Sequence, residues 1–416
     1  MGWYQLISGF HCKEKEDVLI ILRLFLMLLL LIFCNSCPVE TPEPENPWAD
    51  LDHIEFVSSM KIGWNLGNAL DAHINLTPGE TAWGNLKTSQ ALLNSVAAQG
   101  FGAVRIPVTW GTMIGSAPHY TINAAWLDRV AEVVEYVRSA GMRAIINIHH
   151  DGADSQYWLS VKTADLTGTA KAAIDAQFTA VWKQIAGYFK GTGNYLLFEG
   201  FNELHDGSWG NGSTAQRNRV NELNQMFVNT VRAVGGENSS RYLVIHGWVT
   251  RPSITVSSLV IPQDSAKNRI IVGIHYYDPY DFAGSASVNT WGSKSLTGSD
   301  GWANESYLQN TFNAVKEKFT DNGIPVIIGE YGAVRQRNET GRAHRLYYME
   351  YVTKYASDCG FIPFYWDNGA SKAGSEGFGL FSRSSPYGLV ADAADVIAVM
   401  MKAVNNDYLF TDIIVP

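Results

Sequence analysis

The chain has 416 residues, of which 46% are hydrophobic, and a formal net charge of -9 at pH 7. This length suits one large domain of barrel size or two smaller ones. The negative charge argues against a polyanionic partner, so we expect no binding of nucleic acid.

Residues 1–37 have the pattern of an export signal. Residues 18–33 form an apolar run that is interrupted only by Arg23, and Cys34 and Cys37 follow it. The run is short for a membrane span and is typical of the apolar region of a signal peptide. A cysteine just after such a region resembles a bacterial lipoprotein cleavage site. We therefore expect attachment to the membrane through a lipidated Cys37, with the protein secreted or at the outer cell surface; an ordinary signal peptide and an uncleaved anchor are the alternatives.

Residues 38–47 contain four prolines and three glutamates, which is typical of an extended linker. The folded domain is predicted to begin near Trp48 and to extend to residue 416. Three of the four cysteines lie in the first 37 residues, which leaves Cys359 alone in this domain. A disulfide within the domain and a cysteine metal cluster are therefore excluded.

From residue 62 onward, short apolar runs alternate with longer amphipathic stretches. The runs, which we predict to be strands, are residues 62–66, 103–106, 143–148, 195–201, 242–246, 270–275, 326–329 and 361–365. The predicted helices are residues 89–99, 124–139, 170–189, 216–234, 305–321, 341–357 and 391–404. Leu127, Val130 and Val134, for example, fall on one helical face. Eight strands separated by helices predict an α/β fold, a single-domain (β/α)8 TIM barrel over residues 48–416.

One connection does not fit this alternation well. Residues 250–268, between the predicted fifth and sixth strands, show no clear helical pattern. An open, doubly wound sheet is the alternative architecture. Such a sheet typically carries a glycine-rich phosphate loop after its first strand, and the sequence has none there. We therefore prefer the barrel.

Polar or aromatic residues follow nearly all of the predicted strands. In a barrel of parallel strands, the chemically active groups lie at the carboxyl ends of the strands. In chain order these ends carry Asn68, Arg105, His149 and His150, Asn202 and Glu203, Trp248, His275 and Tyr277, Glu330, and Trp366. Two carboxyl groups at the ends of two strands suggest an acid/base and a nucleophile acting as a pair.

His149, His150 and Asp151 form a group that could also bind a metal ion. Neighbouring residues on a strand point to opposite sides, so two adjacent histidines rarely serve one ion. The sequence offers no second cluster of ligands. We therefore expect no metal and no other cofactor, and a metal-dependent hydrolase remains the alternative that chelator sensitivity would reveal.

Seven short motifs occur in the order of a known family. They are Gly63-Trp-Asn-Leu-Gly-Asn68, Arg105-Ile-Pro-Val108, Asn147-Ile-His-His150, Phe201-Asn-Glu203, Val272-Gly-Ile-His-Tyr-Tyr277, Ile328-Gly-Glu-Tyr331 and Tyr365-Trp366. On these motifs, the chain resembles glycoside hydrolase family five, the (β/α)8 cellulase family, over residues 50–406. Leu70-Asp-Ala-His73, Glu80-Thr-Ala-Trp-Gly84 and Asp278-Pro-Tyr-Asp-Phe282 are most similar to its subfamily four, a mixture of endoglucanases, xyloglucanases and mixed-linkage β-glucanases.

The resemblance implies a retaining endo-β-1,4-glucanase that works by double displacement. Glu203 matches the family's general acid/base, and Glu330 matches its nucleophile. The resemblance places Arg105 and Tyr277 beside Glu330, where a cation and a phenol would keep that carboxyl group ionised at neutral pH.

The resemblance also implies supporting roles around the two carboxyl groups. Asn202 would hydrogen-bond the 2-hydroxyl of the sugar. His149 and His275 would orient the carboxyl groups and bind sugar hydroxyls. Trp366 would form a stacking floor under the sugar next to the scissile bond.

Further residues of the predicted loops and strand ends are candidates for binding substrate. They are Asn68, His73, Trp83, His150, Trp209 and Trp248, together with Trp158 and Trp291. Each tryptophan could instead pack under its own loop. The residues do not choose among β-glucans, so a β-mannanase or other β-glycanase on the same barrel is the rival interpretation. A non-catalytic glycan-binding protein would be expected to lack one carboxyl group, and both are present. We expect a monomer that acts on a β-glucan.

Overall fold

The computed structural model describes residues 52–152, 157–295, 303–405 and 407–416. The predicted signal segment, residues 1–37, and the predicted linker, residues 38–47, lie outside the described residues, as does Trp48. Among the helices described, none combines the length and the apolar character that a membrane crossing needs.

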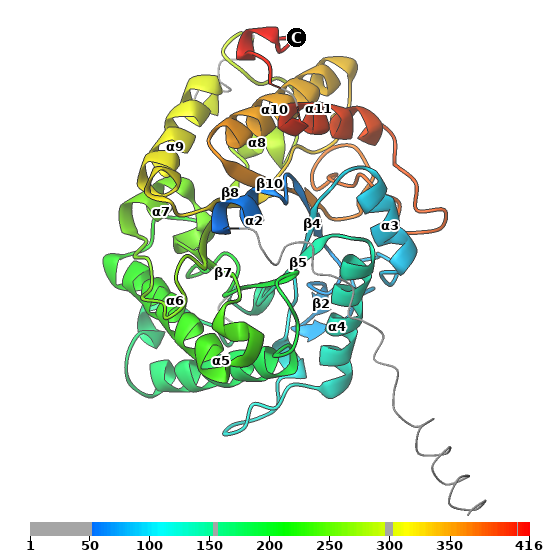
Figure 1. Ribbon diagram of the computed structural model, residues 1–416. Helices are drawn as coiled ribbons and strands as arrows, with labels where there is room; N and C mark the ends of the chain where they lie inside the picture. The colour runs from blue at the N-terminus through cyan, green and yellow to red at the C-terminus, as the bar shows by residue number, and fades with distance from the viewer. Residues whose placement is uncertain (1–51, 153–156, 296–302, 406) are drawn as a thin grey trace, which may run out of the picture. The chain divides into compact units, whose positions relative to one another are not determined.

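Eight parallel strands close into one barrel (Figure 1). They are β1 (Gly63–Leu66), β4 (Ala103–Ile106), β5 (Arg143–Asn147), β6 (Leu196–Glu199), β7 (Leu243–His246), β8 (Ile270–Tyr276), β9 (Val326–Tyr331) and β10 (Phe361–Asp367). Each strand pairs with its neighbours in chain order, and β10 closes the ring on β1. All eight coincide with predicted runs, and the (β/α)8 barrel is confirmed.

Helices surround the barrel and bury one face against it (Figure 1). They are α3 (Gln90–Ala98), α4 (Ala124–Ser139), α5 (Gly168–Tyr188), α6 (Thr214–Val234), α7 (Pro252–Ser258), α8 (Tyr280–Ala283), α9 (Glu305–Lys318), α10 (Glu339–Asp358) and α11 (Ala393–Asn405). Helix α7 occupies the connection in which no helix was predicted. Its seven residues make only two turns, and Pro252 at its start sets its first backbone angle, so no periodic pattern could develop.

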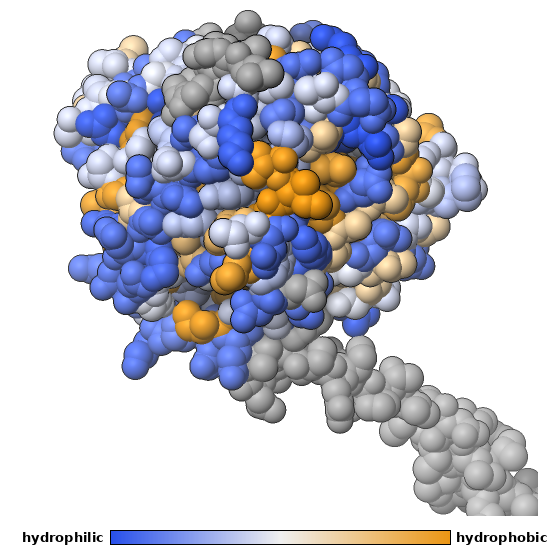
Figure 2. Space-filling model, turned by 90° about the horizontal axis from the view of Figure 1, so that it is seen from above, coloured by the Kyte–Doolittle hydropathy of each residue, from blue (hydrophilic) through white to orange (hydrophobic). Residues whose placement is uncertain are grey.

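The face shown in Figure 2 is mainly hydrophilic, with a large hydrophobic patch near its centre and smaller ones around it. The long helices carry their polar residues on this outer side. In α4, for example, Val130, Val133 and Val137 are fully buried, whereas Glu135 is half exposed. A two-stranded hairpin, β2 (His73–Ile74) and β3 (Thr77–Pro78), lies in the connection after β1.

A separate apolar cluster fills one end of the barrel interior. Helix α2 (His53–Ser58) contributes Phe56, whose ring stacks on Tyr242 with 4.1 Å between ring centres. The strands add inward residues such as Ala103, Ile145 and Leu197. A capping box formed by Asp52 starts α2 and fixes its position in the sequence. Since this end is plugged, the polar residues gather at the opposite, carboxyl end.

Candidate active site

The polar residues at the mouth of the barrel follow from the alternation of each strand. Ala103, Ile145, Leu197 and Val244 point into the barrel and pack in its apolar cluster. Two residues further along the same strands are Arg105, Asn147, Glu199 and His246, all of which are fully buried. Residues two apart in a strand face the same side, so these four side chains also point inward. A layer of polar groups therefore lies directly above the apolar plug.

Strand β9 reaches the same layer by a different route. Its pairing with β8 shifts register between Ile274 and His275, so that Ile274 pairs with Ile328 but His275 pairs with Glu330. The pairing with β10 shifts at the same level. Gly329 is therefore the extra residue of a β-bulge, which changes the side to which the following residue points. Without the bulge, simple alternation from the inward Ile327 would turn Glu330 away from the barrel mouth.

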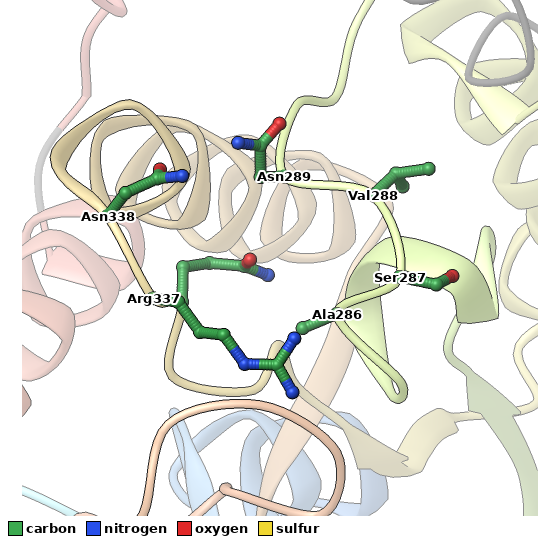
Figure 3. A pocket seen from close by; sticks show the side chains of 7 residues that line it. Ala286, Ser287, Val288, Asn289, Arg337 and Asn338 are labelled. Atoms are coloured by element: carbon green, nitrogen blue, oxygen red, sulfur yellow. The ribbon is translucent and has the colours of Figure 1, made fainter.

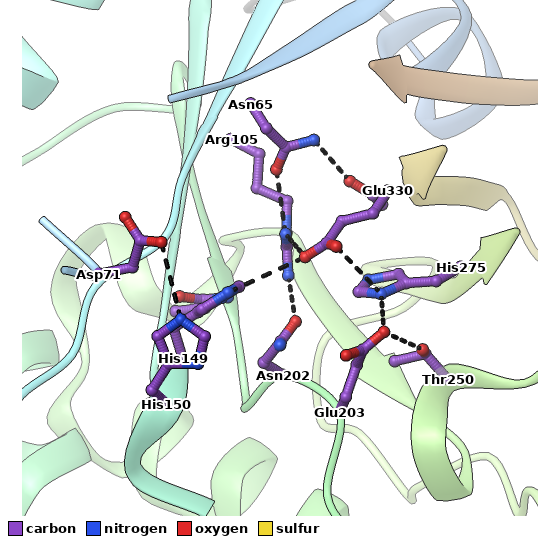
Figure 4. A network of polar contacts seen from close by, with 12 residues as sticks. Asn65, Asp71, Arg105, His149, His150, Asn202, Glu203, Thr250, His275 and Glu330 are labelled. Atoms are coloured by element: carbon purple, nitrogen blue, oxygen red, sulfur yellow. Dashed lines mark hydrogen bonds and ion pairs between the residues drawn. The ribbon is translucent and has the colours of Figure 1, made fainter. Parts of the chain in front are cut away.

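Arg105 organises this layer with all five of its N–H groups. Figure 4 shows its contacts with Asn65, Asn202 and Glu330. Its Nε and Nη2 donate to the two carboxylate oxygens of Glu199, each at 2.7 Å. Nη1 donates to Glu330 at 2.7 Å and to Asn65 at 3.0 Å, and Nη2 also donates to Asn202 at 2.7 Å. A planar guanidinium with every donor engaged has one orientation only. The positions of the other four side chains are thereby fixed relative to each other.

Glu199 was not among the residues that the sequence singled out. It is fully buried and lies 3.1 Å from His246 Nε2 as well as beside Arg105. Burial opposes its charged form, but Arg105 outweighs that effect and holds the pKa of Glu199 well below its ordinary value. The signal that could have found it is an acidic residue inside an otherwise apolar strand.

We expect Glu199→Gln to lower the free energy of unfolding by about 3 kcal/mol, because it leaves Arg105 buried with one carboxylate fewer. The exposed Glu132, which pairs with Arg129, offers a matched control, and Glu132→Gln should cost under about 1 kcal/mol. Urea denaturation measures both. Because the folded pKa of Glu199 is lowered, its contribution is present at neutral pH and is lost as pH falls through that pKa. Equal losses in the two variants would contradict the prediction.

The two predicted catalytic carboxyl groups meet at this mouth. Glu203 follows β6, and one of its oxygens, a ring nitrogen of His275 and an oxygen of Glu330 all lie within 4.8 Å of one another. His275 Nδ1 is 2.7 Å from Glu203 Oε1 and 3.7 Å from Glu330 Oε2. His275 therefore lies between the two carboxyl groups, as Figure 4 shows.

The surroundings of the two acids are unequal. Burial raises the pKa of Glu203, and burial also raises the pKa of Glu330 against the opposing influence of His275 and Arg105. Glu330 accepts hydrogen bonds from Arg105 and, at 3.1 Å, from the Tyr277 hydroxyl. Among the described residues, Glu203 contacts His275 and otherwise accepts only a long hydrogen bond of 3.4 Å from Thr250. A single proton shared by the pair is therefore held better by Glu203.

Two histidines of the site, His149 and His275, are predominantly neutral at neutral pH. Burial lowers the pKa of His275 to about 3 and lowers the pKa of His149 well below its ordinary value. His149 Nδ1 lies 3.1 Å from the Asn147 amide nitrogen, which must donate, so Nε2 carries the ring proton. Nε2 lies 4.0 Å from Glu330. Its N–H group thus lies on the Glu330 side of the mouth.

A cleft of about 850 Å³ opens above these groups. Nine of the residues predicted for the site line it: His149, His150, Asn202, Glu203, Trp209, His275, Tyr277, Glu330 and Trp366. Arg105 lies beneath them. The lining also includes Asp278 and Tyr280, which belong to the motif at residues 278–282, and residues that the sequence did not suggest: His205, Gly207, Val249, Arg251, Pro252, Glu376 and Phe378. Most of these lie on loops with no distinctive motif, so the sequence alone gave no reason to choose them.

Six residues that were predicted as candidates for binding substrate lie outside this lining: Asn68, His73, Trp83, Trp158, Trp248 and Trp291. The rings of His73, Trp83 and His150 form an aromatic group. The centre of the Trp83 ring lies 5.3 Å from that of His73 and 5.3 Å from that of His150. Trp83 is 41% exposed and thus has a free face beside the cleft residue His150. Asn68 is half-buried, and its backbone carbonyl accepts a hydrogen bond from Asn85.

Trp248, which was predicted as a sugar-binding residue, is buried and does not line the cleft. Its side chain is 1% exposed, and its indole nitrogen donates to Gly210 O. The ring packs against Gly212, where an added Cβ would lie 2.6 Å from it. Trp291 is buried in the same way, at 1%. Both rings support loops, and Trp209, 57% exposed, is presented on the loop that Trp248 supports.

Asp151 is not arranged as a metal ligand with the two histidines. Its carboxylate accepts hydrogen bonds from the backbone of Trp110 and Gly111 and from the indole of Trp158. These three donors account for its burial. Asp71 lies closer to the histidines, 3.7 Å from His150, but its oxygens accept from backbone N–H groups of residues 68 and 69. His149 cannot coordinate through Nε2 in its present tautomer.

The chain is similar in sequence and in structure to known endoglucanases. A broad specificity endoglucanase of Bacteroides salanitronis has a TM-score of 0.82 and 46% identity, covering 85% of this chain and 96% of that one. Endoglucanase A of Paenibacillus barcinonensis is 38% identical over 347 residues, covering 79% and 85%. A xyloglucan-specific endo-beta-1,4-glucanase of Bacteroides ovatus is 36% identical over 370 residues, covering 84% and 70%. The family model "Cellulase (glycosyl hydrolase family 5)" matches residues 67–372, and the chain therefore belongs to that family.

Proposed function

We propose that this protein cleaves β-1,4-linked glucans internally and with retention of configuration. The observation that carries the proposal is the close approach of Glu203 and Glu330, whose oxygens lie within 4.8 Å. Carboxyl groups about 5–5.5 Å apart suit direct attack by one of them, whereas about 6.5–9.5 Å leaves room for an inverting water.

The proposal gives each of the two carboxyl groups a separate role. In the first step the Glu330 carboxylate attacks the anomeric carbon, the bond from that carbon to the leaving oxygen breaks, and Glu203 gives its proton to that oxygen. A glycosyl ester on Glu330 and a free chain end result. In the second step Glu203 takes a proton from water, the water oxygen attacks the anomeric carbon, and Glu330 leaves as a carboxylate. Two inversions give net retention.

Asn202 and Trp366 position the sugar for this attack. Arg105 donates to the side-chain oxygen of Asn202, which fixes the orientation of the amide and leaves its NH₂ group to donate to a sugar hydroxyl. Trp366 lines the cleft and offers a flat apolar face to the sugar ring. A hydrogen bond to the 2-hydroxyl strengthens as positive charge develops at the anomeric carbon.

Proton NMR of the first product tests the proposal. A retaining enzyme releases the β-anomer first from a β-glucan, and the α-anomer appears only by mutarotation. Initial release of the α-anomer would mean inversion, and the nucleophile role of Glu330 would have to be abandoned.

The relatives support the proposed substrate class. A broad-specificity endoglucanase and a xyloglucan-specific enzyme are among those similar to this chain. We expect internal cleavage of carboxymethylcellulose, lichenan and xyloglucan, with a rapid fall in viscosity. Preferred cleavage of mannan would favour the β-mannanase alternative. Release of terminal glucose alone, with little loss of viscosity, would contradict an endo-acting enzyme.

The pH–activity profile should be bell-shaped. Glu330 must be ionised to attack, so protonation of Glu330 sets the acid limb; Glu203 must be protonated, so its ionisation sets the basic limb. Burial raises both pKa values above the ordinary value of 4.5, so both limbs should be displaced toward neutral pH. A profile of kcat/KM on lichenan measures this. Activity that stays constant across both limbs would contradict the assignment.

Export and lipid attachment are proposed for the N-terminus. The apolar run at residues 18–33 and the cysteine at position 37 support them. Mass spectrometry of the mature protein from its native host should find an N-terminal, diacylated Cys37. An unmodified N-terminus beyond Cys37 would instead indicate plain secretion. A monomer is proposed for the catalytic domain, and light scattering would test it.

A further inference from the structure

A second cavity of about 310 Å³ lies beside the cleft, outside its lining (Figure 3). Its walls are the loop after α8 and the loop before α10, which contribute Ala286, Ser287, Val288 and Asn289, and Gln336, Arg337 and Asn338. Both loops follow barrel strands, β8 and β9, at their carboxyl ends. The cavity thus opens on the face of the barrel that carries the active site.

One layer of side chains separates this cavity from the cleft. Ala286 belongs to a small apolar cluster with Val334, Trp366 and Phe378. Trp366 and Phe378 line the cleft, so the two hollows share this wall. Arg337 also rests on Gly374, where an added Cβ would lie 2.4 Å from its guanidinium. Gly374 lies in the same loop as the cleft residue Phe378.

The polar groups of the cavity are of the kind that bind hydroxyl groups. Arg335 and Arg342, which are close in sequence, both pair with Asp392, whereas Arg337 has no ion pair within the part of the chain that the structure describes. The side-chain oxygen of Asn338 caps α10 by accepting a hydrogen bond from the Gly341 backbone N–H group. The NH₂ group of Asn338 is therefore left to donate to a ligand. Asn289 adds a second amide.

We propose that this cavity binds a pyranose branch of a glucan whose backbone lies in the cleft. Amide side chains both donate and accept hydrogen bonds, as sugar hydroxyls do, and the paired N–H groups of a guanidinium match two vicinal hydroxyls. Ala286 and Val288 offer apolar contact to the C–H face of the ring. A volume of about 310 Å³ is at the lower end of the range for small-molecule pockets, which suits one sugar unit. The proposal rests on the proposed β-glucanase activity.

The test compares a branched with an unbranched substrate for Arg337→Ala and Asn289→Ala. Xyloglucan carries pyranose branches and lichenan does not. We expect kcat/KM on xyloglucan to fall about tenfold for Arg337→Ala, as for the loss of a charged hydrogen bond, while kcat/KM on lichenan stays within about twofold. Lys267→Ala removes an exposed cation just before β8, at the opposite end of the barrel, and should change neither value.

A binding measurement provides a second readout. With Glu203→Gln present to stop turnover, calorimetry should find that Arg337→Ala weakens binding of a xylose-branched cello-oligosaccharide and leaves cellotetraose binding unchanged. Equal effects on branched and linear ligands, no effect on either, or a native enzyme that cleaves lichenan but not xyloglucan would each overturn the branch site. A native enzyme that cleaves neither polysaccharide would instead overturn the proposed function.

Discussion

Replacing Glu330 by alanine is expected to lower kcat on lichenan by on the order of 10⁴-fold or more, because no other group can form the glycosyl ester. Arg105 and Tyr277 would then direct their N–H and O–H groups at an empty position, since both donate to Glu330 in the native enzyme. Reducing-sugar release under saturating substrate measures the loss.

A second buried glutamate serves as the matched control. Glu350 lies in α10 and is not part of the cleft lining. It accepts hydrogen bonds from Lys402 at 2.6 Å and from the Tyr408 hydroxyl at 2.9 Å. It thus has a cation and a phenol as partners, as Glu330 has. Glu350→Ala should lower stability but keep kcat within a few-fold at a temperature where the protein is folded. Full activity of Glu330→Ala on a β-glucan would refute the role of Glu330 as nucleophile.

Glu203→Ala should have an effect that depends on the leaving group. On a polysaccharide, the departing sugar oxygen needs a proton, and losing the general acid should lower kcat by about 10²–10⁴-fold. A dinitrophenyl cellobioside leaves without protonation, so formation of the glycosyl ester should be nearly as fast as in the native enzyme. Burst kinetics with that substrate separate ester formation from its hydrolysis.

The same variant should lose the basic limb of the pH profile on the activated substrate. That limb reports ionisation of Glu203, whose pKa burial raises, and it has no source once the side chain is gone. Thr250→Val removes a hydroxyl that lies 3.4 Å from Glu203 and 2.5 Å from the Val249 carbonyl oxygen, and as a control this variant should keep both limbs. If the Glu203→Ala enzyme is slowed equally on the polysaccharide and on the dinitrophenyl cellobioside, Glu203 maintains the structure of the site and is not the general acid.

Much of the fold and part of the site could be predicted from alternation and position alone. Apolar runs such as residues 195–201 identified the strands, because parallel strands covered by helices are buried on both faces. A polar residue that follows such a run, such as Asn202, has no place in the core and can be assigned to the mouth. The pairing of Glu203 with Glu330 required in addition the resemblance to a known family.

Other features could not be predicted because they depend on contacts between distant segments. Whether a tryptophan after a strand binds ligand or supports a loop depends on what covers it. Trp248 is covered by Gly212 and donates to Gly210, whereas Trp209 stays exposed, and neither contact can be read from the sequence. Glu199 lies within a predicted strand rather than after it, so a search of strand ends passes over it. Its role appears only when Arg105, 94 residues away, is seen to use both of its oxygens.

The bulge at Gly329 makes the length of β9 as important as its composition. Its freed carbonyl accepts from the Asn65 amide at 2.9 Å, and an added Cβ at Gly329 would lie 3.0 Å from His275. Deleting this one glycine would restore regular pairing and turn Glu330 out of the mouth, although every catalytic side chain would still be encoded. A relative that keeps all the motifs but lacks one residue between Ile328 and Tyr331 should therefore be suspected of being a pseudoenzyme. In an alignment of such sequences, a gap in this strand is therefore as informative as the identity of the catalytic residues.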